Sequence, residues 1–241
     1  MPQIEDLQNR VQAAFLGALA GERIAGAPAA AGDLLEVATS VADRCGYDEA
    51  DLRQRGLARA SQCGAAGLLL RAIPFGLLTP FDRPRLRRDA YRVAALTGTD
   101  EGTAVAAVAT AILVADLTRF EIDTALVRLR QSLLEDAPFA LLERFYAVPV
   151  AQLPSHDEDP GAALQIAVSA IAAADSVESA LGQITAPGTR AALSIAGALA
   201  GVRFGLGPDE WRASLPQGVR AVGLAETIAA GAVGASAIGG T

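Results

Sequence analysis

The sequence predicts an all-α protein. Alanine and leucine dominate its 241 residues, aromatic residues make up only 5%, and β-branched residues rarely occur in alternating runs, which favours helices packed through small side chains. Glycines, prolines and acidic N-cap residues divide the chain into roughly a dozen helical segments. No linker interrupts this pattern, and a chain that is 51% hydrophobic can bury a substantial core. We therefore expect one domain over residues 1–241, with no sheet of more than two short strands.

The first helical segments follow from the spacing of their apolar residues. The stretch "IEDLQNRVQAAFLGALAGE" places apolar side chains three or four positions apart from Leu7 to Ala18, which buries one face of a helix. The stretch "DLLEVATSVADRCG" repeats this spacing from Leu34 to Val41, and Gly46 is expected to end it.

Later boundaries are marked by capping signals and by one polar loop. The stretch "ADSVESAL" predicts a capping box from Asp175 to Glu178, and "GPDEWRASL" predicts a short helix with Pro208 in its first turn. Between residues 152 and 161, "QLPSHDEDPG" is typical of a surface loop. It holds the only histidine, His156, which we interpret as a solvated loop residue because no second histidine or cysteine lies near it in sequence.

Charge and cysteine content exclude several classes of function. A net charge of −7 argues against a nucleic-acid partner, and the absence of lysine excludes lysine-based covalent catalysis. The one basic cluster, from Arg83 to Arg88 in "DRPRLRRDAYR", is interpreted as a solvated helix face, with an anion site as the alternative. Cys45 and Cys63 are expected to be small core residues rather than a disulfide.

The sequence also predicts a protein without a membrane partner. The start "MPQIEDLQNR" has no basic segment before an apolar one, so it does not predict a secretory signal. The longest uncharged segments fall short of the roughly 18 to 20 residues that span a bilayer. We expect a cytoplasmic protein whose partner is an unknown protein or a second copy of the chain.

Three stretches, in order, resemble the ADP-ribosylglycohydrolase family, which includes ADP-ribosyl-arginine hydrolases, dinitrogenase-reductase activating glycohydrolases and the J1 crystallins. "AAFLGALAGERIAGAP" is similar to the family opening, approximately GALLGLAVGDALGAP. "GAAGLLLRAIPFGLL" with "LTGTDEGTAVAAVATAIL" is similar to the central segments SNGALMRIAPLAL and LTHPHPEAVAGAVALAAAI. "SIAGALAGVRFGLGPDEW" is similar to the closing AIAGALAGAYYG helix and the short helix after it. The resemblance implies a compact orthogonal bundle of helices with a cleft.

The resemblance implies that, in active relatives, two magnesium ions bind in that cleft and hold ADP-ribose and a water molecule in place. Their ligands come from an early TDDT motif and a late DADT motif, each at the start of a helix. Magnesium requires such hard oxygen donors. In this chain Asp33 matches the first aspartate of the early motif, but Leu34 and Leu35 replace the second aspartate and the threonine. At the late motif, Gly188 and Arg190 replace the aspartates, and Ala191 replaces the threonine.

Further replacements surround the expected cleft. They are Glu22 for the aspartate of GDALG, Ala66 for the asparagine of SNG, and Gly98 for the histidine of LTHPH. We expect no bound metal or cofactor, and we take Glu22, Asp33, Asp100 and Arg190 as remnants of the cleft. The resemblance suggests Arg71 as a substrate-binding residue. Because an arginine suits pairing with a carboxylate, Arg190 is expected to contact Asp33, with Glu22 or Asp100 as further partners. The alternative is an exposed arginine at the helix start.

Two questions stay open at this stage. In one alternative alignment Glu226 and Thr227, rather than residues 188–191, match the late motif. In function, the favoured hypothesis is a degenerate family member without magnesium-dependent hydrolase activity, a binding, regulatory or structural pseudoenzyme that can retain an ADP-ribose-like ligand. The alternative is an active hydrolase of an ADP-ribose conjugate, with Glu22, Asp33, Asp100 or Glu101 used differently. An unrelated helical interaction module is a third reading.

Overall fold

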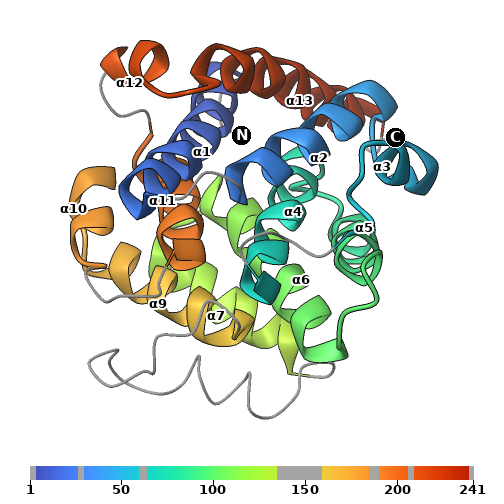
Figure 1. Ribbon diagram of the computed structural model, residues 1–241, viewed down its shortest axis with the longest axis horizontal. Helices are drawn as coiled ribbons and strands as arrows, with labels where there is room; N and C mark the ends of the chain where they lie inside the picture. Colours follow the sequence, from blue (N-terminus) through green and yellow to red (C-terminus); the bar gives the residue numbers. More distant parts are fainter. Residues whose placement is uncertain are drawn as a thin grey trace.

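The computed structural model describes residues 4–26, 30–59, 64–134, 159–184, 190–205 and 209–238. Within these ranges the chain forms twelve α-helices and no strand, which confirms the all-α prediction (Figure 1). The helices are α1 (Ile4–Ala25), α2 (Ala30–Arg44), α3 (Glu49–Gln54), α4 (Gly64–Leu78), α5 (Arg83–Ala95), α6 (Glu101–Leu117), α7 (Ile122–Leu133), α9 (Pro160–Ala172), α10 (Val177–Gly182), α11 (Arg190–Phe204), α12 (Asp209–Ser214) and α13 (Gly218–Ile238).

The closest helix pair is α1 with α11, which run antiparallel. A Cβ atom built on Gly17 would lie 2.0 Å from the carbonyl oxygen of Gly197, and one built on Gly201 would lie 2.0 Å from that of Ala13. Only glycine allows the two backbones this approach. The small-residue pattern of both segments therefore determines how near the helices pack, and it places the end of α1 beside the start of α11.

Helices α4 and α6 form the centre of the other half of the molecule (Figure 1). Every residue of α6 from Thr103 to Leu117 is buried, which explains why its sequence is apolar on all sides rather than on one face. Helix α4 is buried from Ala66 to Leu78, and α2, α5 and α9 pack around this pair. Within the described ranges, no helix combines the length and the hydropathy that a membrane span needs.

Several local predictions need correction. The N-cap of α10 is Ser176, whose hydroxyl accepts a hydrogen bond from the Ser179 N–H, rather than Asp175. Cys45 is exposed rather than buried, because α2 ends at Arg44 and the chain turns there through a left-handed conformation. The predictions for Cys63, His156, Gly188 and Pro208 concern residues outside the described ranges.

The arginines of α5 are not simply a solvated helix face. Arg88 pairs with its neighbour Asp89 within α5. Arg83 pairs with Asp116 of α6, and Arg87 donates to the carbonyl oxygen of Ser132 in α7. The contacts of Arg83 and Arg87 join α5 to α6 and α7.

Candidate functional site

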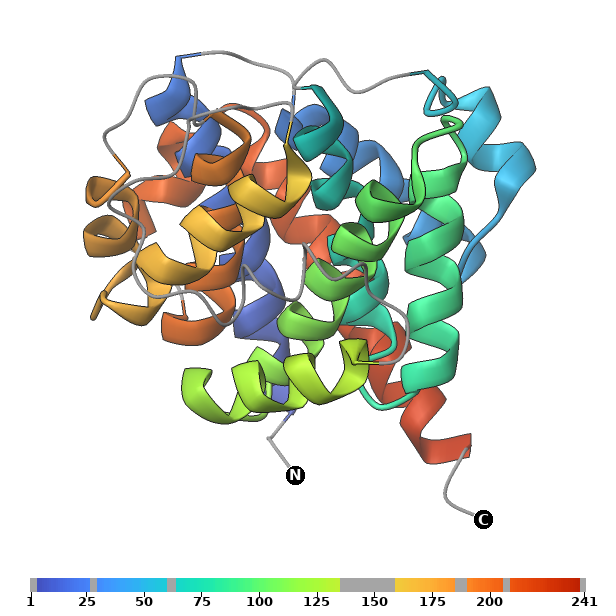
Figure 2. The ribbon, with the colours of Figure 1, turned by 90° about the horizontal axis from the view of Figure 1, so that it is seen from below.

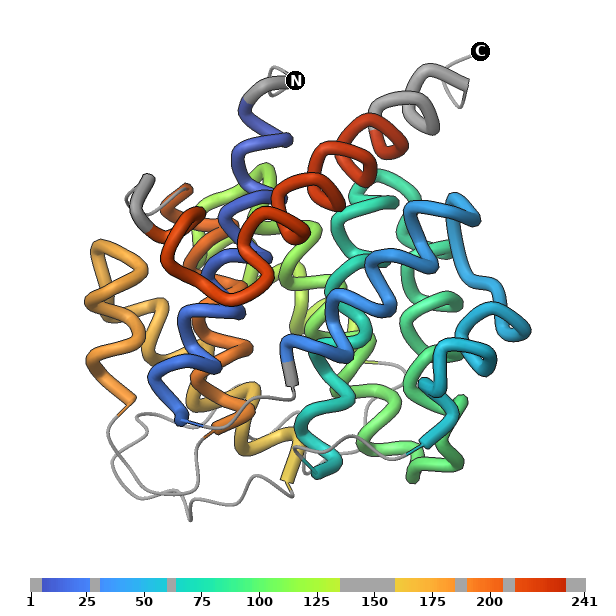
Figure 3. The backbone as a smooth tube through the Cα atoms, turned by 45° about the horizontal axis from the view of Figure 1, so that its top comes forward, coloured from blue at the N-terminus to red at the C-terminus, as the bar shows by residue number. Residues whose placement is uncertain are grey.

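Several helix termini meet at one end of the bundle. Figure 3 shows the end of α1 and the starts of α4, α9 and α11 along its lower edge, with the start of α2 just above them. This is the end of the molecule at which the sequence placed Glu22, Asp33 and Arg190. The fold therefore gathers the predicted cleft remnants of α1, α2 and α11 at one end.

The central feature of this end is a buried ion pair between Asp33 and Arg71. Asp33 lies in the first turn of α2 and is 4% exposed, whereas Arg71 of α4 has no exposed surface. Arg71 Nη2 and Nε lie 2.6 and 3.2 Å from the same Asp33 oxygen, Oδ2. The other oxygen, Oδ1, lies 3.8 Å from Arg59 Nη2. Both oxygens of the carboxylate therefore face guanidinium groups.

The remaining donor group of Arg71 is bound by main-chain oxygens. Arg71 Nη1 donates to the carbonyl oxygens of Leu57 and Arg59, at 2.7 and 3.1 Å. Arg71 thus joins α2, α4 and the turn after α3. Since all three guanidinium nitrogens already bind protein groups, a substrate contact by Arg71 stays a prediction that competes with these contacts.

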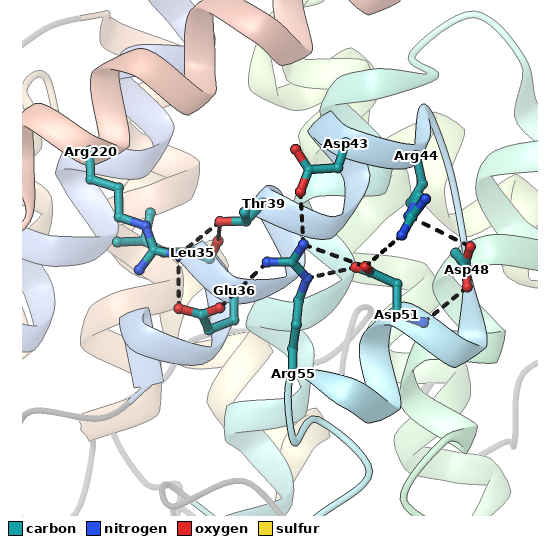
Figure 4. A network of polar contacts seen from close by, with 9 residues as sticks. All are labelled: Leu35, Glu36, Thr39, Asp43, Arg44, Asp48, Asp51, Arg55 and Arg220. Carbon is teal, nitrogen blue, oxygen red and sulfur yellow. Dashed lines mark hydrogen bonds and ion pairs between the residues drawn. The ribbon is translucent and has the colours of Figure 1, made fainter.

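An ion-pair network fixes α3, and therefore that turn, against α2 (Figure 4). Arg55 Nε lies 2.6 Å from Asp51 Oδ2, and Arg55 Nη2 lies 2.7 Å from Asp43 Oδ2 on α2. The hydrogen bonds from Arg55 and Arg44 lower the pKa of Asp51 to about 2 in spite of its burial. The network thus positions the segment that supplies two carbonyl oxygens to Arg71.

The same network reaches the last helix. Arg220 of α13 pairs with Glu36 of α2 at 2.8 Å and donates to the Thr39 hydroxyl at 2.8 Å (Figure 4). Helix α2, which carries Asp33, is therefore bound by polar contacts on both sides.

The other predicted site residues have separate local roles. Glu22, partly buried, accepts a hydrogen bond from the Ala31 N–H at 3.3 Å and so caps the start of α2. Asp100 is the exposed N-cap of α6, and hydrogen bonds from the Thr103 hydroxyl and N–H lower its pKa. Glu22 and Asp33 are thus brought together at one helix start, whereas Asp100 is engaged with its own helix.

The predicted contact between Arg190 and Asp33 does not form. Arg190 is the exposed first residue of α11, and among the described residues no carboxylate lies within 4.0 Å of it. The guanidinium that reaches Asp33 comes instead from Arg71, because α4 packs directly on α2.

The comparisons with known proteins agree with this architecture. The ADP-ribosylglycohydrolase family model matches residues 26–237. The chain belongs to the ADP-ribosylglycohydrolase family. A solved structure described as an "ADP-ribosylglycohydrolase-related protein complex" has the same fold, with a TM-score of 0.80 and 21% identity over 95% of this chain and 99% of that one. Among curated proteins, no match reaches significance.

In this family the two motifs are the positions at which metal ligands are expected, so the side chains found there can be tested as magnesium ligands. Leu34 and Leu35, which follow Asp33 at the early motif, have no exposed surface and no side-chain oxygen. Ala191, at the late motif, is also fully buried, and Ala66 replaces the asparagine of α4. In the described part of the chain, no group of three or more acidic, histidine or cysteine residues is arranged to hold a metal ion. These residues do not fit a pair of magnesium ions, which need several oxygen ligands.

The resemblance implies a late motif at the start of a helix, and the two alignments differ in this respect. Arg190 and Ala191 are the first residues of α11, beside the end of α1. Glu226 and Thr227 lie in the middle of α13 and are exposed, and the Thr227 hydroxyl donates to the carbonyl oxygen of Gly223. Of the two alignments, only the one that includes Arg190 and Ala191 places its described residues at a helix start in this ADP-ribosylglycohydrolase family member.

Sequence reasoning missed the residues that surround Arg71. Two of its acceptors are main-chain oxygens, which carry no residue-type signal, and Arg59 is one arginine among many. The one available signal was Arg71 itself, a lone charged residue inside the apolar stretch "GLLLRAIPFGLL". A charge in such a stretch requires a buried partner.

Proposed function

We propose that this member of the family has no magnesium-dependent hydrolase activity and acts as a binding or regulatory protein. The observation that carries the proposal is the state of Asp33. This one retained acid of the early motif is buried, and both of its oxygens face arginine side chains. A carboxylate neutralised in this way has little electrostatic attraction left for a cation.

The size of the expected defect follows from the role of the metals. In a paired metal site, the ions stabilise the charge that develops in the transition state. Loss of one important stabilising group commonly costs about 100- to 1,000-fold in rate. Here Leu34, Leu35 and Ala191 stand at three of the ligand positions, so the combined loss should bring turnover to background.

The proposal also includes a ligand at the Asp33 end of the molecule. The chain keeps the fold of a family-related structure, so an ADP-ribose-like molecule or a protein partner is the expected occupant of this end of the molecule. Isothermal titration of the purified protein with ADP-ribose, with and without millimolar magnesium, tests this directly. We expect any ADP-ribose binding to be independent of magnesium. A Kd that tightens with magnesium would contradict the proposal.

The decisive experiment is a hydrolysis assay. ADP-ribosylated arginine and serine peptides are incubated with the protein and magnesium, with an active family hydrolase as the positive control. The matched variant is Asp33→Asn, which removes the charge and keeps the shape. We expect the parent and the variant to be equally inactive. Magnesium-dependent turnover that Asp33→Asn abolishes would overturn the proposal and support a rearranged active hydrolase, whose other candidate acids are Glu22, Asp100 and Glu101.

A further inference from the structure

A pocket of about 520 Å³ lies at the end of the molecule opposite to Asp33. It is formed between the start of α1 and the junction of α6 and α7, and its lining residues are Asp6, Arg10, Phe81, Thr118, Arg119, Phe120 and Glu121. In Figure 2 the start of α1 and helix α7 lie at the lower edge, whereas the end of α1 and the start of α4 lie at the upper edge. Arg10 near one end of α1 and Glu22 near the other are about 18 Å apart along the helix axis. The pocket is therefore separate from the family cleft.

An excess of positive charge lies behind this pocket. The Asp116 side chain has no exposed surface, and three guanidinium groups surround its carboxylate. Arg83 Nη2 lies 2.8 and 2.7 Å from its two oxygens, Arg119 Nη2 lies 3.0 Å away, and Arg128 Nε lies 3.4 Å away. One carboxylate compensates one of these three charges, which leaves two without a partner in the cluster.

Two nitrogen atoms of the cluster also lack a hydrogen-bond acceptor. Arg83 Nη1 and Arg119 Nε are buried and make no hydrogen bond within the described structure. A buried N–H without an acceptor is unfavourable by about 1 to 3 kcal/mol, and by more for a charged group. The unsatisfied nitrogens add to the positive charge of the cluster, and this charge favours an additional anion beside it.

Arg119 connects the cluster to the pocket. It lines the pocket, and its guanidinium carbon lies 5.1 Å from the ring centre of Phe81 and 5.0 Å from that of Phe120. Burial lowers the pKa of Arg119, and repulsion by Arg128 and Arg83 adds to this effect against the attraction of Asp116. The two rings hold the guanidinium in place, so little side-chain entropy is lost when it binds a ligand.

The other charges of the pocket lower this excess from two positive charges to one. Asp6 is paired with Arg10 at 3.1 Å, and Arg10 also donates to the carbonyl oxygens of Leu117 and Val202. Glu121 is the remaining acid. The pocket and the cluster behind it together hold four guanidinium groups, Arg10, Arg83, Arg119 and Arg128, and three carboxylates, Asp6, Asp116 and Glu121.

We propose that this pocket binds a small oxyanion, a phosphate or carboxylate, carried on a flat apolar group. Arg119 is its charged contact, and the rings of Phe81 and Phe120 pack against the apolar group. The volume suits a ligand of this size. The inference is independent of the proposed function of the Asp33 end.

Isothermal titration of the full-length protein with phenyl phosphate, benzoate and inorganic phosphate tests the proposal. We expect phenyl phosphate or benzoate to bind with a Kd in the millimolar range or below, and inorganic phosphate to bind more weakly because it does not use the rings. Comparison of phenyl phosphate with benzoate identifies the preferred oxyanion. Arg119→Gln should weaken binding by at least about tenfold, since one charge-assisted contact contributes on the order of 1.4 kcal/mol or more. Arg53→Gln, at an exposed arginine of α3, is the matched control and should bind as the parent does.

Loss of binding in Arg119→Gln must be distinguished from misfolding, and a second variant, Phe120→Leu, tests the pocket independently. Arg83 keeps both of its bonds to Asp116 in Arg119→Gln, so the fold should persist, and circular dichroism checks this. Phe120→Leu leaves the arginine cluster intact and should bring the affinity for phenyl phosphate towards that for inorganic phosphate. Absence of binding by all three probes would overturn the proposal. So would equal affinity of the parent, Arg119→Gln and Phe120→Leu.

Discussion

The contact between α1 and α11 gives a sharp test of the packing that the structure describes. In Gly197→Ala, the new Cβ atom would lie 2.0 Å from the Gly17 carbonyl oxygen, where ordinary contacts begin at 3.4 Å. The helices would have to separate by about 1.4 Å at this point. The Gly17 oxygen is a backbone atom, and the new Cβ atom is fixed directly to the backbone of α11, so no flexible side chain can move aside.

The expected magnitude is a balance of two effects. Forcing extra volume into a packed interface costs about 3 kcal/mol when the neighbours cannot rearrange. Replacing a helical glycine by alanine returns about 1 kcal/mol through helix propensity. We therefore expect Gly197→Ala to lower the free energy of unfolding by about 2 kcal/mol.

The matched control is Gly223→Ala in α13. This glycine is exposed in a helix, and its added Cβ would meet nothing within 4 Å. It should raise the free energy of unfolding by up to about 1 kcal/mol, because only the propensity effect remains. Urea unfolding followed by far-ultraviolet circular dichroism measures both variants. A Gly197→Ala protein at least as stable as the parent would refute the close approach of the two helices.

Three further outcomes are expected. Arg71→Met should lower the free energy of unfolding by about 3 to 5 kcal/mol, because it leaves the Asp33 carboxylate buried without its partner. Adding Asp33→Leu to the same chain should restore much of this loss, and urea unfolding that shows no such recovery would contradict the buried pair. Because the pKa of Asp51 falls from 3.8 to about 2 on folding, its contribution to stability is complete above about pH 5 and is lost as the pH falls through about 2. In acid titrations, Asp51→Asn should therefore lose less stability over that interval than the parent. An unchanged profile would exclude the Arg55 contact as its source. Asp100→Ala should lower stability by about 1 kcal/mol through loss of the α6 cap, whereas a thermal melt identical to that of the parent would show that the cap is dispensable.

Much of this protein could be predicted from its sequence because the relevant signals are local. The hydrogen bonds of a helix join residues four positions apart, so apolar spacing and end signals predict helices such as α1 and α2 without knowledge of the fold. The chemical type of a motif residue is also local. Leucine at positions 34 and 35 offers no side-chain oxygen ligand in any arrangement, and the family resemblance needed only the order of the motifs.

The partners of the charged residues were decided by the tertiary structure. Asp33 could have paired with any of several arginines, and the sequence favoured Arg190 because both lie at motif positions. The packing of α4 on α2 brings Arg71 to Asp33 instead, although 38 positions separate the two residues in the chain. Asp116, likewise, acquires Arg83 only where α5 meets the end of α6. An ion pair depends on distance in space and on burial, and neither quantity follows from spacing along the chain until the helices are packed.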